Sequence, residues 1–309
     1  MDKSAHKSGF VSVNGINLHY LDWDGRGEVL LFLAGMGDNT HVFDHFAPRF
    51  ADKFHVMALT RRGHGESDHP ETGYDVDTLT SDLRQFLDAL GIEKVILAGH
   101  SMAGIELSHF SALYPERVLK LIFLDAALDR SSASYKNMRE KNPLRHIQAP
   151  GLDVDYYSME EYFAAMKRAF PYFVAIWTES MEVQCRHQLM KTPEGKIVEK
   201  MSDAINKAIM DTLTSYVPED SKIKVPTLSF FAISEGGYAI SDDWMTEEQK
   251  TQIMNHFETT ANSWKKENIE QFRQNVPHAK IVEIPQGHHH CFIKHEELVY
   301  EEMRKFLLE

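Results

Sequence analysis

Short apolar segments alternate with helix-length polar stretches over the first third of the chain. Residues 10–13 and 17–21 are predicted to pair as a hairpin, because Asn14 and Gly15 between them favour the positive φ angles of a tight turn. Apolar strands separated by helical segments are typical of an α/β protein with a mostly parallel sheet, buried on both faces. Further strands of this kind are predicted at Val29–Leu33, His55–Leu59, 95–98 and 120–124.

A helix is predicted at residues 77–90, and Gly91 is expected to end it. One face of this helix carries the apolar residues Leu79, Leu83, Phe86, Leu87 and Leu90.

The pattern changes after Asp125. Residues 130–220 carry no convincing strand, although Met, Tyr and Phe side chains crowd positions 156–190. Strand character returns at 227–232 and 280–284, and a helix is predicted at Glu296–Leu308.

These segments predict an α/β core domain of residues 1–128 and 221–309, interrupted by a helical cap of residues 129–220. Such an insertion leaves and rejoins the sheet at its carboxyl edge. It is therefore expected to lie over the crevice where open α/β sheets bind ligands.

Composition narrows the function classes. The 309 residues carry 33 Lys and Arg against 46 Asp and Glu, a formal net charge of −13. This negative field repels phosphate backbones and anionic lipids, so nucleic acid and membranes are not expected partners. No apolar run approaches the roughly 20 residues of a membrane-spanning helix. The polar residues 1–9 also lack the apolar centre of a signal peptide.

The two cysteines, Cys185 and Cys291, lie far apart and outside any metal-ligand spacing. We therefore expect a cytoplasmic protein with reduced thiols, no metal and no other cofactor. A homo-oligomer stays open.

The sharpest chemical signal is the stretch 95–104, Val-Ile-Leu-Ala-Gly-His-Ser-Met-Ala-Gly. Ser101 is expected on a turn between an apolar strand and a helix that begins at Ala103. A serine forced onto such a turn has strained backbone angles, so the residues two before and two after it, Gly99 and Ala103, have to be small. The helix N-terminus behind the turn favours developing negative charge. We therefore predict that Ser101 is a nucleophile.

With this turn the chain resembles the α/β-hydrolase family over nearly its whole length outside the insertion. Residues 31–36, Leu-Phe-Leu-Ala-Gly-Met, resemble the family's oxyanion loop, with Ala34 where the family usually has His. The resemblance implies that the backbone N–H groups of Met36 and Met102 form an oxyanion hole. Residues 60–67 resemble the family's Arg-Gly-X-Gly-X-Ser turn, which is structural.

The resemblance also implies a catalytic histidine after the final strand. Residues 285–290, Pro-Gln-Gly-His-His-His, align without a gap with the family's pattern at His289. His288 is the alternative if the loop is one residue shorter. A metal site built from His288 and His290 has no carboxylate partner at a useful spacing and is not favoured.

Two carboxylates compete to be the acid of a catalytic triad. Glu235 follows the strand at 227–232, at the family's usual position, with Glu in place of Asp. Asp125 ends the strand at 120–124, where some branches of the family have their acid. Either would orient the imidazole and stabilise its cation, and the sequence does not decide between them.

These residues predict a serine hydrolase that cleaves a carboxylic ester, or a related acyl bond, through an acyl-enzyme on Ser101. Family members that open epoxides or displace halide use an Asp nucleophile, so Ser101 argues against both. Four alternatives stay open: a carbon–carbon bond hydrolase, a lactonase, a cofactor-free oxygenase and a ligand-binding receptor with slow turnover.

Side chains of the insertion are expected to form part of a pocket roof, which favours a small-to-medium, largely apolar ester as substrate. No cation is an obvious clamp for a carboxylate or phosphate, since the sequence does not fix the directions of Arg145, Arg168 and Arg186. The charges between Asp242 and Lys266 are expected on a solvated helix face. The aromatic and Met residues of the insertion are Tyr156, Tyr157, Phe163, Met166, Phe170, Tyr172, Phe173, Trp177, Met181 and Met190.

Overall fold

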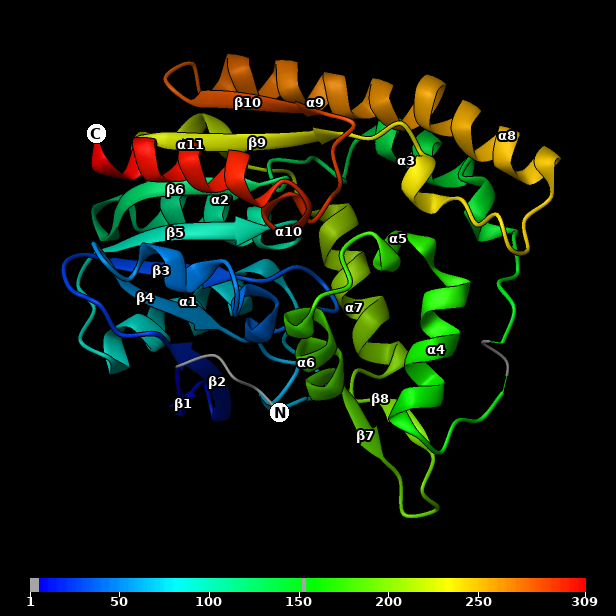
Figure 1. The fold of residues 1–309 in the computed structure, drawn as a ribbon. Coiled ribbons are helices and arrows are strands. Elements are labelled where there is room, and N and C mark those ends of the chain that lie inside the picture. Colours follow the sequence, from blue (N-terminus) through cyan, green and yellow to red (C-terminus); the bar gives the residue numbers. More distant parts are fainter. Residues whose placement is uncertain (1–5, 152–153) are drawn as a thin grey trace.

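The computed structural model describes residues 6–151 and 154–309, and it is built around one large β-sheet (Figure 1). The sheet has eight strands in the order β1-β2-β4-β3-β5-β6-β9-β10. From β4 to β10 each strand is parallel to its neighbour, whereas β2 is antiparallel to both β1 and β4. The strands are β1 Lys7–Val13, β2 Ile16–Asp22, β3 Val29–Leu33, β4 His55–Leu59, β5 Val95–His100, β6 Val118–Leu124, β9 Thr227–Ile233 and β10 Lys280–Pro285.

Helices connect the parallel strands and cover both faces of the sheet. Helices α1, α2 and α9 pack on one face, and α11 packs on the other. The core helices are α1 Val76–Ala89, α2 Ala103–Leu113, α8 Glu247–His256, α9 Asn262–Asn275, α10 Cys291–Lys294 and α11 Glu296–Leu308, with a π-helical segment, Phe257–Ala261, between α8 and α9.

The alternation of side chains along each strand produces two separate apolar cores. In β3, Leu30 and Phe32 face the α11 side, whereas Leu31 and Leu33 face the α1 and α2 side. Both sets are buried. Because the central strands are covered on both faces, they have to be apolar at every position, which explains their continuous apolar sequences.

The predicted fold class, a mostly parallel sheet flanked by helices, is confirmed. Strands β3 and β4 and helix α11 have the predicted bounds, and α1 lies one residue earlier than predicted. The predicted hairpin is β1 and β2, and its turn residues Asn14 and Gly15 have φ angles of 48° and 75°.

The chain between β6 and β9 forms a separate group of short elements, and we refer to residues 129–220 as the insertion. In Figure 1 most of it lies beside the sheet, at the end toward which β5 and β9 point. Its elements are α3 Ala133–Glu140, α4 Met159–Ala169, α5 Pro171–Val174, α6 Glu179–Gln188, β7 Leu189–Lys191, β8 Ile197–Glu199 and α7 Asp203–Ser215.

The expectation that this segment carries no strand is wrong. Strands β7 and β8 pair antiparallel as a ribbon of their own, apart from the main sheet. Each strand is three residues long. A segment this short shows too few alternations to be recognised from its pattern. Among the described residues, no helix is both long and apolar enough to cross a membrane.

Helix α2 lies unusually close to the chain that follows β6. A Cβ atom added to Gly104, in the first turn of α2, would lie 1.9 Å from the carbonyl oxygen of Ala126. Neither backbone segment can yield without moving a whole element. A side chain at position 104 would therefore displace α2 from the sheet.

We accordingly expect Gly104→Ala to lower the free energy of unfolding by about 3 kcal/mol or more, as overpacking of a rigid core does. Gly237→Ala is the matched control, because nothing lies within 4 Å of a Cβ at that position. Urea unfolding of both variants measures the difference. Equal midpoints would contradict the close approach of α2.

Candidate active site

Ser101 lies on the sharp turn between β5 and α2. Its φ angle is 53°, in the left-handed region that residues other than Gly rarely adopt. A Cβ on Gly99 would lie 2.8 Å from the Cβ of Ala103. The two positions therefore have to stay small, because the turn brings them together beneath Ser101.

A continuous hydrogen-bond chain runs from Ser101 through His289 to Asp125. The Oγ of Ser101 lies 2.7 Å from Nε2 of His289, and Nδ1 of His289 lies 2.6 Å from Oδ2 of Asp125. A carboxylate only accepts hydrogen bonds, so Nδ1 carries the ring proton. Nε2 is then free to accept the proton of the Ser101 hydroxyl.

Asp125 is held rigidly at the end of β6. Its side chain accepts hydrogen bonds from the backbone N–H of Ala232, at 2.9 Å, and from Nζ of Lys265, at 2.7 and 2.9 Å. Burial alone would raise the pKa of this carboxyl, but the charge of Lys265 and the contact with His289 hold the pKa far below its usual range. Asp125 is therefore ionised over the whole neutral range.

Lys265 is a residue that the sequence analysis assigned wrongly to a solvated helix face. Only 9% of it is exposed, and it ion-pairs with Asp125 from α9. The misassignment arose because the neighbouring residues, such as Lys266, are indeed exposed. A signal was present, since Lys265 falls on the same face of α9 as the buried Asn268 and Phe272.

The ring of His289 remains partly accessible, with 31% of its side chain exposed. Burial lowers the pKa of His289 below its ordinary value of 6.5, and Lys265 adds to this effect. The contact with Asp125 opposes both. The balance leaves a neutral imidazole at neutral pH, which is the form that can accept a proton.

The other two predicted alternatives lie elsewhere. Glu235 is exposed in the loop after β9, while Nδ1 of His289 is occupied by Asp125. His288 is buried, with its Nε2 at 3.1 Å from the carbonyl oxygen of Tyr172 and its ring stacked on that tyrosine. The structure therefore brings His289, and not His288, next to Ser101. It brings Asp125, and not Glu235, next to His289.

The backbone amides of Met36 and Met102 belong to two adjacent turns, after β3 and after Ser101. In the described part of the chain neither amide donates a hydrogen bond to another protein group. Arg61 fixes the first turn, because its Nη1 donates to the carbonyl oxygens of Ala34 and Gly35 at 2.6 and 3.1 Å. In a trans peptide the N–H points opposite to the C=O, so the Gly35 contact turns the amide of Met36 away from Arg61.

Arg61 is itself held by a buried ion pair with Glu106 of α2, whose Oε2 lies 3.1 Å from Nε and 2.5 Å from Nη2. The residue belongs to the 60–67 turn, which resembles a structural motif of the family. Through these contacts Arg61 connects the loop after β3 with helix α2, which begins directly after the Ser101 turn.

A second polar cluster lies next to this chain. His290 Nε2 lies 3.1 Å from Oδ2 of Asp38, and Nδ1 of His100 lies 3.6 Å from the same oxygen. The Nε2 of His100 donates to the carbonyl oxygen of His289 at 3.0 Å. The cluster therefore connects three segments of the site: His100 directly precedes Ser101, His290 directly follows His289, and Asp38 lies two residues after Met36.

Two groups of His and Asp side chains are compact enough to share a metal ion, with ligand atoms within 4.8 Å of one another. Both contain hydrogen-bonded His–Asp pairs, one between His290 and Asp38 and one between His41 and Asp44. His288, which the sequence analysis weighed as a ligand, belongs to neither. The groups are Asp38, His100 and His290, and His6, His41 and Asp44.

A cavity of about 900 Å³ lies between the insertion and the loop after β3. The core side contributes Met36, Asp38 and His290 to its wall. Of the residues expected in a pocket roof, Tyr157 and Met190 are exposed instead. The others line the cavity: Tyr156, Phe163, Met166, Phe170, Tyr172, Phe173, Trp177 and Met181.

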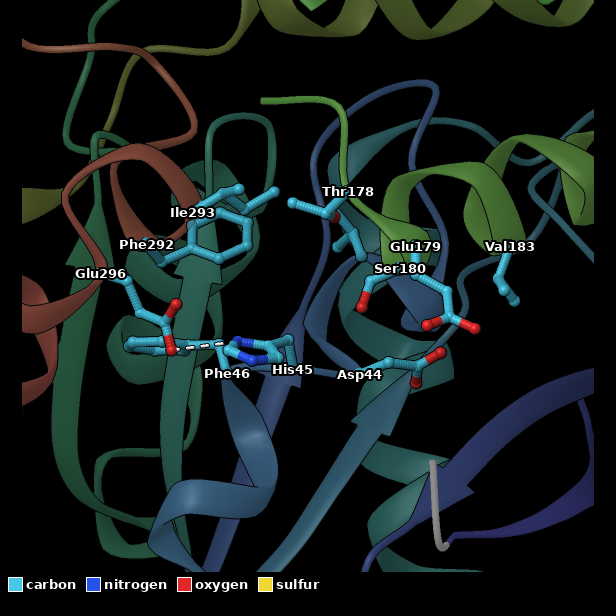
Figure 2. A pocket seen from close by; sticks show the side chains of 11 residues that line it. Asp44, His45, Phe46, Thr178, Glu179, Ser180, Val183, Phe292, Ile293 and Glu296 are labelled. Carbon is cyan, nitrogen blue, oxygen red and sulfur yellow. Dashed lines mark hydrogen bonds and ion pairs between the residues drawn. The ribbon is translucent and has the colours of Figure 1, made fainter. Parts of the chain in front are cut away.

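A smaller hollow of about 410 Å³ lies between the start of α6 and the segment from α10 to α11 (Figure 2). Its polar wall includes the hydrogen-bonded pair of His45 and Glu296, at 3.1 Å. None of the residues of the Ser101 chain lines it. Ser101, His289 and Asp125 do not line the larger cavity either, but that cavity borders the chain at Met36 and His290, and the smaller hollow borders neither of these residues.

One sequence expectation needs a further correction, because a cation does lie at this site. Arg130, in the chain after β6, has its Nη2 at 3.4 Å from Oγ of Ser101. The sequence analysis looked for such a cation only among arginines deeper in the insertion. The position of Arg130, five residues after Asp125, was the available signal.

Removal of the Lys265 cation should raise the pKa of His289. In Lys265→Met the positive charge that disfavours the imidazolium is gone, while Asp125 still favours it. An NMR titration of the His289 ring measures the shift, with the resonance assigned through a His289→Asn variant.

Lys266→Met is the matched control, because Lys266 is exposed on the same helix. The pKa of His289 is expected to stay in place in this variant. An unchanged pKa in Lys265→Met as well would mean that the charge of Lys265 does not act on the His289 ring.

Comparison with known proteins places this geometry in a family. A family model described as the alpha/beta hydrolase fold matches residues 28–296. Mouse "Epoxide hydrolase 4" is 34% identical over 115 residues, which are 36% of this chain and 32% of that protein. A "2-(acetamidomethylene)succinate hydrolase" of Mesorhizobium japonicum is 35% identical over 101 residues, 33% of this chain and 36% of that protein.

These matches span about a third of the curated relatives, so they do not carry an activity over to this chain. The crystal structure of E-2-(acetamidomethylene)succinate hydrolase has a TM-score of 0.74 and 19% sequence identity. That match covers 98% of this chain and all of the other, and it shows a shared fold. The chain belongs to the α/β-hydrolase fold family.

Proposed function

We propose that the protein is a serine hydrolase that cleaves a carboxylic ester or a related acyl bond. The observation that carries the proposal is the hydrogen-bond chain of Ser101, His289 and Asp125, with contacts of 2.7 and 2.6 Å. A hydroxyl paired with a neutral imidazole, which is in turn held by a carboxylate, is the arrangement that activates a serine for attack on a carbonyl carbon.

The proposed reaction begins with proton transfer from Oγ of Ser101 to Nε2 of His289. The serine oxygen attacks the carbonyl carbon, and the free amides of Met36 and Met102 stabilise the oxyanion. His289 then gives its proton to the leaving alcohol. Water, activated by the same ring, cleaves the acyl-enzyme and restores Ser101. No cofactor is needed for any of these steps.

We assign the acid role to Asp125. Its carboxylate contacts the ring nitrogen that has to be protonated, and Lys265 and the amide of Ala232 keep it ionised and fixed in place. Glu235 is exposed to solvent, where water would screen its effect on the ring.

The named activities of the relatives do not all fit this site equally. Epoxide opening in this family is expected to use a carboxylate nucleophile, and Ser101 stands at that position. The apolar and aromatic walls of the 900 Å³ cavity support an acyl substrate of small to medium size with a largely apolar body. We propose no nucleic-acid or membrane partner.

Replacement of Ser101 by Ala should reduce kcat/KM on p-nitrophenyl esters by about 10⁴-fold or more, since the nucleophile is lost. Release of p-nitrophenol from esters of increasing acyl length is the measurement. Ser263→Ala, an exposed serine on α9, is the control and should retain turnover. Wild-type rates in Ser101→Ala would refute the acyl-enzyme mechanism, and no turnover by folded wild-type protein would favour the carbon–carbon hydrolase or receptor alternatives.

The two carboxylates can be separated by isosteric amides. Asp125→Asn should reduce kcat by about 10⁴-fold, because the amide stabilises the wrong ring tautomer of His289. Glu235→Gln should remain close to wild type on the same esters. The reverse order of effects would assign the acid role to Glu235.

A further inference from the structure

Arg130 is a cation at the site for which the proposed mechanism has no use. Its Nη2 donates to Oγ of Ser101 at 3.4 Å, the same oxygen that lies 2.7 Å from Nε2 of His289. Its other terminal nitrogen, Nη1, is buried and has no hydrogen-bond partner. Burial lowers the pKa of Arg130, although arginine remains charged at neutral pH.

The carboxylates near Arg130 are already committed to other groups. Asp125 binds His289, Lys265 and the amide of Ala232. The Oδ1 of Asp129 accepts from the amide and the hydroxyl of Ser131. Within the described ranges, 6–151 and 154–309, Arg130 makes no ion pair.

Two fully buried arginines show how a structural cation is paired in this protein, whereas Arg130 is only partly buried. Arg61 pairs with Glu106, and Arg62 pairs with Asp82 through two contacts of 2.6 and 2.8 Å. A charged donor nitrogen that is shielded from water and has no acceptor destabilises a protein, so it is expected where a ligand supplies the opposite charge. Arg130 alone among the three leaves a donor nitrogen free, and it does so beside the nucleophile.

The planar guanidinium matches a carboxylate better than other anions of similar size, because two parallel N–H groups meet two oxygens. A carboxylate bound at hydrogen-bond distance from Nη1 and Nη2 would lie within a few bonds of a carbonyl carbon attacked by Ser101. The cavity that begins at Met36 and His290, beside Ser101, would receive the remainder of the molecule.

We propose that Arg130 binds a free carboxylate of the substrate, so that the substrate is an anionic acyl compound with its carboxylate a few bonds from the scissile carbonyl. This inference rests on the proposed acyl transfer at Ser101. It replaces the expectation that the site has no clamp for a carboxylate. The residue that binds the carboxylate comes from the chain that directly follows β6, and not from Arg145, Arg168 or Arg186.

Mono-p-nitrophenyl fumarate and its methyl ester test the proposal. The two esters differ in one negative charge and one methyl group, and the trans double bond prevents the carboxylate from attacking its own ester. The quantity measured is the ratio of kcat/KM for the anionic ester to kcat/KM for the neutral ester. We expect the wild type to prefer the anionic ester.

In Arg130→Gln this ratio should fall about 10- to 100-fold, the usual worth of a hydrogen bond to a charged group. Arg130→Lys should restore part of it. Arg186→Gln is the matched control, since Arg186 is half-exposed and paired with Glu182, and the ratio should not change. A ratio that is the same in wild type and Arg130→Gln would overturn the proposal, because Arg130 would then act on Ser101 and not on the substrate.

A stability measurement excludes a merely structural role. Removal of a partly buried cation that has no counter-ion should leave the melting temperature of Arg130→Gln unchanged or raise it, whereas a clear drop would contradict the absence of a counter-ion.

Failure of the proposed function has a different signature, namely no Ser101-dependent turnover of either ester. In that case calorimetric titration with monomethyl fumarate still decides the inference. Binding that requires Arg130 supports it, and equal binding or no binding by both proteins refutes it.

Discussion

The close approach of α2 to the ends of β5 and β6 is the steric constraint from which the site is built. Gly104 meets the carbonyl oxygen of Ala126, and Gly99 meets Ala103. These contacts force Ser101 into the left-handed region and place its hydroxyl at the carboxyl edge of the sheet. They also leave the amide of Met102, at the N-terminus of α2, without a hydrogen-bond partner among residues 6–151 and 154–309.

The two basic residues near this turn differ in whether they have a counter-ion. Lys265 forms an ion pair with Asp125, and both members of the pair are buried and hydrogen-bonded. In the described part of the chain Arg130 has no such partner, and its Nη1 makes no hydrogen bond. One basic residue thus stabilises the carboxylate that holds His289, and the other contacts Ser101 with a donor group left over.

The sequence was sufficient for the central strands, because burial on both faces gives β3 and β4 an unmistakable apolar run. It was also sufficient to single out Ser101 and His289 as neighbours, through the small residues of the turn and the position after the last strand. The choice between Asp125 and Glu235 was beyond it, because both follow adjacent parallel strands. The decision depends on where the loop after β10 crosses the sheet edge, which is a long-range contact.

Lys265 and Arg130 were missed for a related reason. A basic residue looks the same in a sequence whether it faces water or a buried carboxylate 140 positions away. The ribbon of β7 and β8 was not predicted from the sequence, because each strand is only three residues long and pairs with the other strand apart from the main sheet.

The contacts of Gln184 have a consequence for how the cavity is entered. Its Nε2 donates to Oδ1 of Asp38 at 2.8 Å, and its backbone carbonyl oxygen accepts from Nδ2 of Asn39 at 2.9 Å. Helix α6 is thereby latched to the same loop that carries the Met36 amide. A movement of α6 away from the sheet would break these two hydrogen bonds and free the loop that carries the Met36 amide. Substrate entry that leaves this loop in place therefore requires an opening elsewhere in the insertion.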